Sequence, residues 1–179
     1  MRFLTAVALA LVMLWVPVDG VAQQSALQDD PLRGTSRVFS RVLLSMTESI
    51  PEERVAEFEE EIQDAFDLGL LRAGIELNQQ DPERLGPVLL NCEALVLLAA
   101  GIPGTSVPYM LVTSGVYLEE IMPAEARLDP VPPGTNFWLV QTWKGLRDLR
   151  YQPLPDFSGT EIGEFCADQF LTAWRRANN

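Results

Sequence analysis

The sequence predicts a single α+β domain, because two long helical patterns enclose a group of alternating, strand-like segments. Apolar residues recur at three- and four-residue steps over residues 50–72 and again over residues 161–177. Between these helices lie three alternating segments, separated by stretches rich in proline and glycine (87–99, 108–121 and 136–144). We expect these three strands to form an antiparallel meander. An all-α bundle is the alternative, since residues 88–100 and 109–122 are apolar enough to form helices.

The first 22 residues have the pattern of a secretory signal peptide. Arg2 precedes an apolar run over residues 3–16, and the small residues Gly20 and Ala22 stand at −3 and −1 of a cut before Gln23. The run is short for a membrane span, so we expect no transmembrane segment in the mature chain. The sequence therefore predicts a protein exported to the periplasm or to the medium, with three parts: a signal peptide (1–22), a flexible leader (23–34) and one domain (35–179).

The domain opens with a strand, a long helix and a short strand. Residues 37–46 alternate with one fully apolar side, which fits a strand; a helix is the alternative for this stretch. Ser49 and Pro51 then supply a cap oxygen and a first-turn proline, which favour the start of a helix near Ile50. Gly74 is a natural helix end, and residues 75–77 follow as a short strand.

The domain closes with a second helix. Ser158 or Thr160 can cap its start, and Arg175 and Arg176 in the last turn complement the helix dipole. Its apolar stripe includes Cys166. The fold is thus expected to run strand, long helix, short strand, three-stranded meander and C-terminal helix.

Composition excludes several classes of function. The net charge of −12, with no local basic cluster, disfavours nucleic acid as a partner. The chain has no histidine, which removes serine–histidine and cysteine–histidine catalysis and the commonest transition-metal ligand. Two cysteines are too few for a thiolate metal cage. We therefore expect no cofactor and no metal.

The two cysteines are expected to form one disulfide. Cys92 falls on the more apolar side of its strand, and Cys166 falls on the apolar stripe of the last helix. A helix packed on a sheet can bring two such positions together, and an oxidising compartment favours the bond. In the chain-entropy model a loop of this length stabilises the fold by about 4 kcal/mol. Two free thiols in the core are the alternative.

The order of elements also carries a resemblance. The chain has Leu71–Ile75 at the end of its long helix, a Thr142–Trp143 pair in the meander, and an aromatic-rich last helix over Phe170–Asn178. With these segments it resembles a set of uncharacterised exported bacterial proteins. The resemblance implies an α+β fold and brings no activity with it.

Clusters of carboxylates are better explained as solvated surface than as a reactive site. Glu119 and Glu120 are adjacent at a strand end, where neighbouring side chains point to opposite faces, so they do not form a glycosidase pair. Calcium sites usually bend ligands around the ion with a loop, whereas a straight helix arranges carboxylates along a ridge. Four acidic residues of the long helix share such a ridge (Glu57, Glu60, Glu61 and Asp64).

Both sides of the meander are apolar, which predicts that something covers the second face. A sheet with one solvated face alternates cleanly between apolar and polar residues, and this one does not. A helix on that face, a second subunit or a ligand would satisfy the pattern. In the first case the long helix would cover one face of the sheet and the closing helix the other. The residues we expect on the binding face are aromatic or large and apolar (Tyr109, Leu111, Tyr117, Trp138 and Trp143).

Two classes of function follow from this face. The first is a non-catalytic envelope protein that binds a protein partner, or another copy of itself, through the aromatic sheet face. The second is a carrier whose pocket for a small apolar ligand lies between sheet and helix. Carboxylate-only catalysis stays open as a third class.

Overall fold

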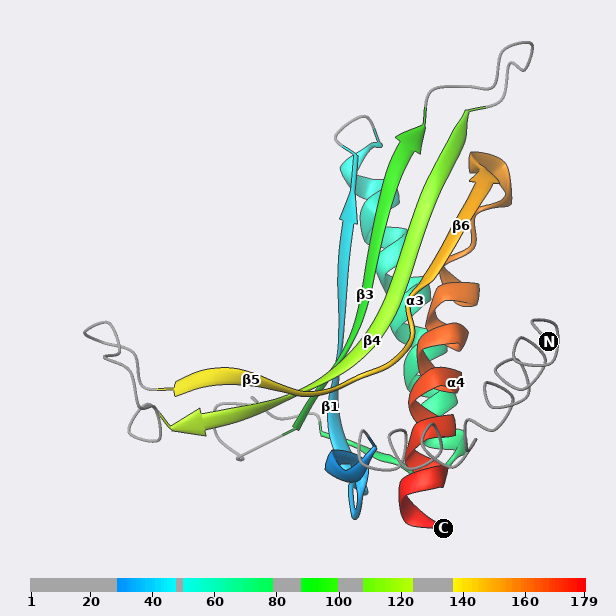
Figure 1. Cartoon of the computed structure of the whole chain (residues 1–179). Coiled ribbons are helices and arrows are strands. Elements are labelled where there is room, and N and C mark those ends of the chain that lie inside the picture. Colours follow the sequence, from blue (N-terminus) through cyan, green and yellow to red (C-terminus); the bar gives the residue numbers. More distant parts are fainter. Residues whose placement is uncertain (1–28, 48–49, 79–87, 100–107, 124–136) are drawn as a thin grey trace, which may run out of the picture.

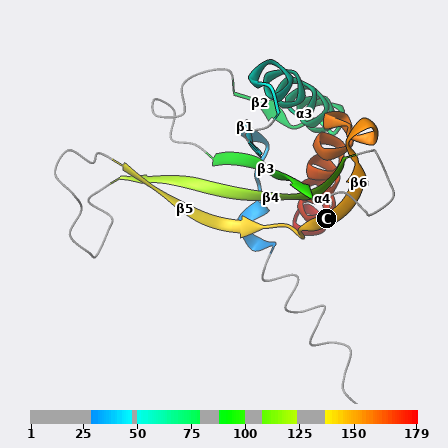
Figure 2. The ribbon, with the colours of Figure 1, turned by 90° about the horizontal axis from the view of Figure 1, so that it is seen from above.

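The computed structural model describes residues 29–47, 50–78, 88–99, 108–123 and 137–179 of the chain. It contains a six-stranded mixed sheet, and two long helices pack side by side on one face of that sheet (Figures 1 and 2). The described residues therefore form one layer of strands and one layer of helices, with the core between them. This arrangement confirms the α+β class.

The strands do not lie in sequence order. The sheet order is β2-β1-β3-β4-β5. β6 and β5 pair with the same edge of β4, β6 with residues 109–114 and β5 with residues 117–123. Their bounds are β1 (Arg37–Met46), β2 (Glu76–Leu77), β3 (Val88–Ala99), β4 (Tyr109–Pro123), β5 (Phe137–Lys144) and β6 (Asp148–Pro153).

Strands β3, β4 and β5 pair antiparallel, which confirms the predicted meander. β1 pairs parallel with both β2 and β3, because α3 (Glu52–Arg72) returns the chain across the sheet between β1 and β2. β6 has no counterpart in the sequence prediction. Ser49, which was expected to cap the first helix, lies outside the described residues.

The long helix α3 buries the stripe that its periodicity predicts. Phe58, Ile62, Phe66 and Leu70 are buried at steps of four residues. Gly74 follows the helix at a φ of +83°, a left-handed conformation that glycine adopts without steric cost.

Helix α4 (Gly159–Asn178) lies parallel to α3 at very short range. A Cβ built on Gly163 would lie 2.4 Å from the Ile62 carbonyl oxygen, and one built on Gly69 would lie 2.6 Å from the Ala167 Cβ. At the start of α4 the Gly159 N–H donates to a carboxylate oxygen of Glu61 at 3.1 Å. Glycine at these positions therefore allows the two helices to touch.

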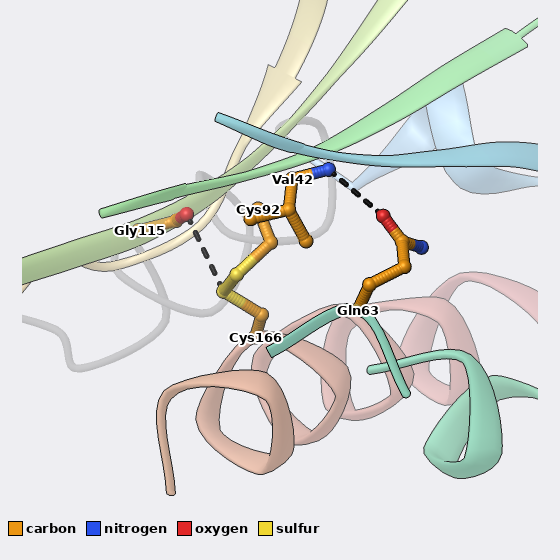
Figure 3. The surroundings of a disulfide bond; sticks show 5 residues. All are labelled: Val42, Gln63, Cys92, Gly115 and Cys166. Carbon is orange, nitrogen blue, oxygen red and sulfur yellow. Dashed lines mark hydrogen bonds between the residues drawn. A yellow bond between two sulfur atoms is a disulfide. The ribbon is translucent and has the colours of Figure 1, made fainter. Parts of the chain in front are cut away.

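The disulfide joins α4 to the centre of the sheet (Figure 3). Cys92 and Cys166 are bonded, with their Cα atoms 5.7 Å apart, and both are fully buried. This confirms the predicted pairing. The Cys166 sulfur also lies 3.5 Å from the Gly115 carbonyl oxygen, a packing contact because a disulfide sulfur carries no proton. In the same region the Val42 N–H donates to the Gln63 side-chain oxygen at 3.1 Å, which satisfies a donor on the edge of β1.

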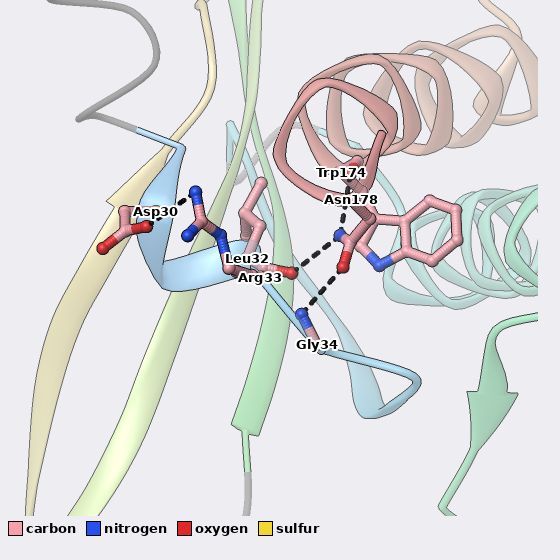
Figure 4. Close-up of polar contacts among 6 residues, drawn as sticks. All are labelled: Asp30, Leu32, Arg33, Gly34, Trp174 and Asn178. Carbon is pink, nitrogen blue, oxygen red and sulfur yellow. Dashed lines mark hydrogen bonds and ion pairs between the residues drawn. The ribbon is translucent and has the colours of Figure 1, made fainter.

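The N-terminal end of the described chain is held against the end of α4 (Figure 4). Asn178 accepts a hydrogen bond from the Gly34 N–H at 2.8 Å and donates one to the Leu32 carbonyl oxygen at 3.1 Å. Leu32 lies in a 3-10 turn, η1 (Asp30–Leu32), and is fully buried. Residues 29–34 thus differ from the flexible leader that was expected, because one apolar side chain anchors them. The signal peptide and residues 23–28 lie outside the described residues.

Asp29 ties this turn to the sheet as well. Its buried carboxylate accepts a hydrogen bond from the Trp143 indole N–H at 3.1 Å and lies 2.9 Å from the Arg176 guanidinium. A buried carboxylate is costly unless it is paired, and both partners here come from distant parts of the chain. We name these contacts of Asp29, Leu32 and Gly34 with the C-terminal region the terminal clamp.

Candidate interaction surface

The helices leave one face of the sheet without a described covering element. α3 contacts β1, and α4 contacts β3 and β4, all on the face that carries Cys92 and Val116 (Figure 2). Side chains alternate along strands, so the neighbours of these residues project to the opposite side. We call that side the open face. The two helices do not divide between the two faces, so neither of these described helices covers the second apolar side of the meander.

Apolar side chains gather on the half of the open face nearest the end of β6. Leu97 pairs with Leu111, and Leu111 pairs with Tyr151, so these three side chains form a row across three strands. The ring of Tyr109 stacks on that of Tyr151, with centroids 5.1 Å apart. We define the open-face patch as these residues together with two from the adjacent row (Leu95, Leu97, Tyr109, Leu111, Leu149 and Tyr151).

Much of this patch is exposed. Leu149 is 67% exposed and Tyr151 is 49% exposed, while Leu95 and Leu97 are exposed to a smaller degree. Exposed apolar side chains that occur singly need no explanation, but a contiguous group on three strands typically marks an interaction site. The open-face patch is therefore the strongest candidate site among the described residues.

A polar network occupies the middle of the same face. The Arg41 guanidinium donates to the Asn91 side-chain oxygen at 2.9 Å, and the Asn91 amide donates to Glu119 at 2.9 Å. In the neighbouring row Arg147 donates to Glu93 at 2.8 Å. Asn91 is fully buried, so its two partners satisfy an amide that water does not reach. The network sets a polar border to the open-face patch.

Tyr117 lies within this polar network. Burial raises the pKa of its phenol above the ordinary value of 10.0, and the carboxylates of Glu119 and Glu93 raise it further, while Arg41 and Arg147 act in the opposite sense. The phenol therefore stays protonated, and neutral, to higher pH than it does in the unfolded chain.

We expect this shift to appear in a tyrosinate titration. The chain has three tyrosines, and one ionisation above the ordinary value should disappear in the variant Tyr117→Phe. Because the folded-state pKa is raised, its contribution to stability is fully present below pH 10.0 and is lost as pH rises through that pKa. Ultraviolet difference absorbance of the two proteins measures the titration. An unchanged titration curve in the variant would contradict the assignment.

Not all of the residues expected on a binding face meet on this surface. Tyr109, Leu111 and Tyr117 share the open face. Trp143 is a correction: it is only 4% exposed and packs edge-on against Phe170 of α4, on the helix-covered face. Trp138 of β5 pairs with Met122, and its side chain lies outside what the structure describes.

A β-bulge explains the misplacement of Trp143. On β5, Trp143 pairs with Leu118 and Gln141 pairs with Glu119, so Thr142 is an extra residue between two consecutive pairs. Residues two apart normally share a face, but across this bulge Gln141 and Trp143 point to opposite faces. Strict alternation cannot show such a shift.

The interpretation of the carboxylates as surface charge is compatible with the geometry. Within the described ranges, no group of three or more histidine, cysteine, aspartate or glutamate residues is arranged to hold a metal ion. In the same part of the chain, no helix has both the length and the apolar character needed to cross a membrane.

Comparisons with known proteins add little. No protein-family model matches the chain, and a search of curated proteins finds no match. Among solved structures, the chain is similar to one described as a homolog of a neuraminyllactose-binding hemagglutinin from Helicobacter pylori. That match covers 78% of this chain and 83% of the other, with 12% identity and a TM-score of 0.32.

Proposed function

We propose that this chain is an exported, non-catalytic protein that acts through protein–protein contact on its open face, with a second copy of itself as the partner. The observation that carries the proposal is the open-face patch, whose apolar side chains adjoin across three strands. Association would remove this apolar surface from water, which is the main driving force of most protein interfaces.

The distribution of charge favours a second copy on this face. α3 and α4 together carry eleven acidic and four basic side chains, so two helix layers would repel each other. The middle of the open face carries three basic and two acidic side chains and is close to neutral (Arg41, Lys144, Arg147, Glu93 and Glu119). Two copies can therefore approach through their open faces without strong repulsion.

Export is supported by two features of the chain. Residues 1–22 have the composition of a signal peptide, and the buried disulfide is of the kind that forms and persists in oxidising compartments. The resemblance to uncharacterised exported bacterial proteins agrees with both. We propose the periplasm or the medium as the location.

The alternative, a carrier of small apolar ligands, has less support. The space between sheet and helices is filled by large side chains that are fully buried, among them Phe66, Phe170 and Met110. A carrier pocket would need this space for its ligand. Lipid that co-purifies with the protein would instead support the carrier function.

We expect the mature protein to form dimers that depend on the open-face patch. Two charges in the variant Leu97→Asp/Tyr151→Asp would sit where apolar surface is buried on association, and should weaken self-association at least about tenfold. Sedimentation velocity over a concentration series measures the dissociation constant. Native mass spectrometry of the unreduced protein gives the stoichiometry and shows whether a ligand is bound.

The matched control is Leu68→Asp/Leu71→Asp, which adds the same two charges. Leu68 and Leu71 are 46% and 54% exposed on α3, away from the sheet, so this variant should leave the dissociation constant unchanged. A wild-type protein that stays monomeric at every concentration would exclude a second copy as the partner. Equal weakening by both variants would show that added charge, not the open-face patch, controls association.

A further inference from the structure

A groove runs between α3 and α4 on the side of the helix layer away from the sheet. Its volume is about 710 Å³, and residues of both helices line it from Glu61 and Thr160 at one end to Arg72 and Arg175 at the other. Along α3 the distance from Glu61 to Arg72 is eleven helical steps, or about 17 Å at the rise of an α-helix. The groove therefore has room for roughly three turns of a third helix laid along the pair.

The floor of the groove is apolar and is formed by small side chains. Gly69 and Ala167 form its centre, where the two helices are in contact, and Leu68 rises beside them with 46% of its surface exposed. Small residues at such a seam let another backbone or apolar side chain approach closely. Helices pack by placing side-chain ridges in grooves of this kind.

The charges along the groove are segregated. Four carboxylates line it and two guanidiniums stand together at its far end (Glu61, Asp64, Glu164 and Asp168; Arg72 and Arg175). Asp64, Glu164 and Asp168 have no ion-pair partner within the residues described, and neither have the two arginines. The groove thus has unbalanced negative charge around an apolar floor.

We propose that this groove is a docking site for a cationic amphipathic helix of a partner protein. The apolar stripe of that helix would lie on Leu68 and the glycine–alanine floor, with basic side chains reaching Asp64 and Glu164. The acidic helix layer as a whole would attract such a segment from solution. A second copy is a poor occupant here. Each groove has twice as many acidic side chains as arginines, so two grooves brought face to face would repel each other.

The arginines give the docked helix a direction. The carboxylates at one end of the groove attract positive side chains of the partner, whereas Arg72 and Arg175 at the other end repel them. A helix bound here would place acidic side chains or its carboxyl end at those arginines. This orientation separates groove binding from general attraction to an acidic surface.

Synthetic peptides test the proposal directly on the oxidised mature protein. The probe is a leucine–lysine peptide of about four helical turns with its leucines on one face, and the comparison peptide has glutamate in place of lysine. We expect the lysine peptide to bind, by calorimetry or fluorescence anisotropy, and the glutamate peptide not to bind. Affinity should fall as added salt shortens the screening length.

Paired variants locate the binding. The variant Asp64→Lys/Glu164→Lys should weaken binding of the lysine peptide at least about tenfold. The control Glu59→Lys/Glu60→Lys makes the same change in net charge at exposed positions of α3 outside the groove, and should change affinity less than about threefold. Replacing the repelling cations in Arg72→Gln/Arg175→Gln should strengthen binding.

Three results would overturn the proposal. One is no binding of the lysine peptide at about 100 μM. Another is equal weakening by the groove and control variants, which would mean that only overall charge matters. The third is equal binding by a lysine peptide whose leucines are scrambled around the helix, because the apolar floor would then have no role. None of these results bears on the open face, which is tested separately.

Discussion

Removing the disulfide is expected to lower the stability of the fold severely. The variant Cys92→Ala/Cys166→Ala opens a cross-link that spans 74 residues, and the chain-entropy model gives a loss of about 4 kcal/mol in the free energy of unfolding. Both positions are fully buried, so alanine also leaves unfilled volume at the contact of α4 with β3. Urea unfolding of the variant and of the oxidised wild type measures the difference.

Reduced wild-type protein separates the two contributions. Reduction breaks the cross-link but keeps both sulfur atoms, so it should give most of the loss seen in the alanine variant. Because neither sulfur is exposed, we expect reduction to require unfolding, and the native unreduced protein to show no alkylatable thiol by mass spectrometry. A loss below about 1 kcal/mol in both experiments would contradict the entropic account.

The second large effect is expected from adding one methyl group in Gly163→Ala. The new Cβ would lie 2.4 Å from the Ile62 carbonyl oxygen and 2.9 Å from the Phe66 nitrogen, both of them backbone atoms of α3. Neither atom can move without displacing the helix. We expect a loss of about 3 kcal/mol, at the upper end of the range for overpacked cores.

The result is opposite to the effect of alanine on an isolated helix. Alanine is favoured over glycine by about 1 kcal/mol at a helix position that touches nothing. Thr172→Ala, at an exposed position of the same helix, is the control and should change stability by less than about 0.5 kcal/mol. Thermal unfolding of both variants measures the effects, and a Gly163→Ala protein as stable as the wild type would mean that the helices do not touch there.

Local patterns predicted most of the secondary structure because they depend on neighbouring residues alone. The periodicity of the long helix gave its four buried positions, and alternation along β4 correctly separated residues such as Val116 from residues such as Tyr117. The disulfide could be predicted because Cys92 was assigned to the apolar side of its strand and Cys166 to the apolar stripe of the last helix. In each case one face of an element had to be apolar, and the order of residue types showed which face.

What the patterns missed depends on contacts between distant segments. Nothing in residues 37–46 indicates that β1 pairs parallel with β3, because alternation is the same for either direction. β6 was missed although Leu149 and Tyr151 alternate with polar residues, because the strand is only six residues long and ends in a proline. The bulge beside Leu118 reverses the face of Trp143, and alternation alone does not show it. Both helices pack on one face of the sheet, and the sequence did not indicate this because both sides of the meander are apolar.

The terminal clamp has a consequence for when the chain can acquire its structure. Gly34 and Leu32 are held by Asn178 across separations of 144 and 146 residues. A ribosome adds roughly 5–20 residues per second, so for several seconds the early residues exist without the helix end that will hold them. Contacts so distant in sequence also close slowly, because of the entropy of the intervening loop. The emerging polypeptide therefore lacks its terminal clamp until synthesis is nearly complete. This delay suits the export that we propose, because an extended chain is the form that can be threaded across a membrane.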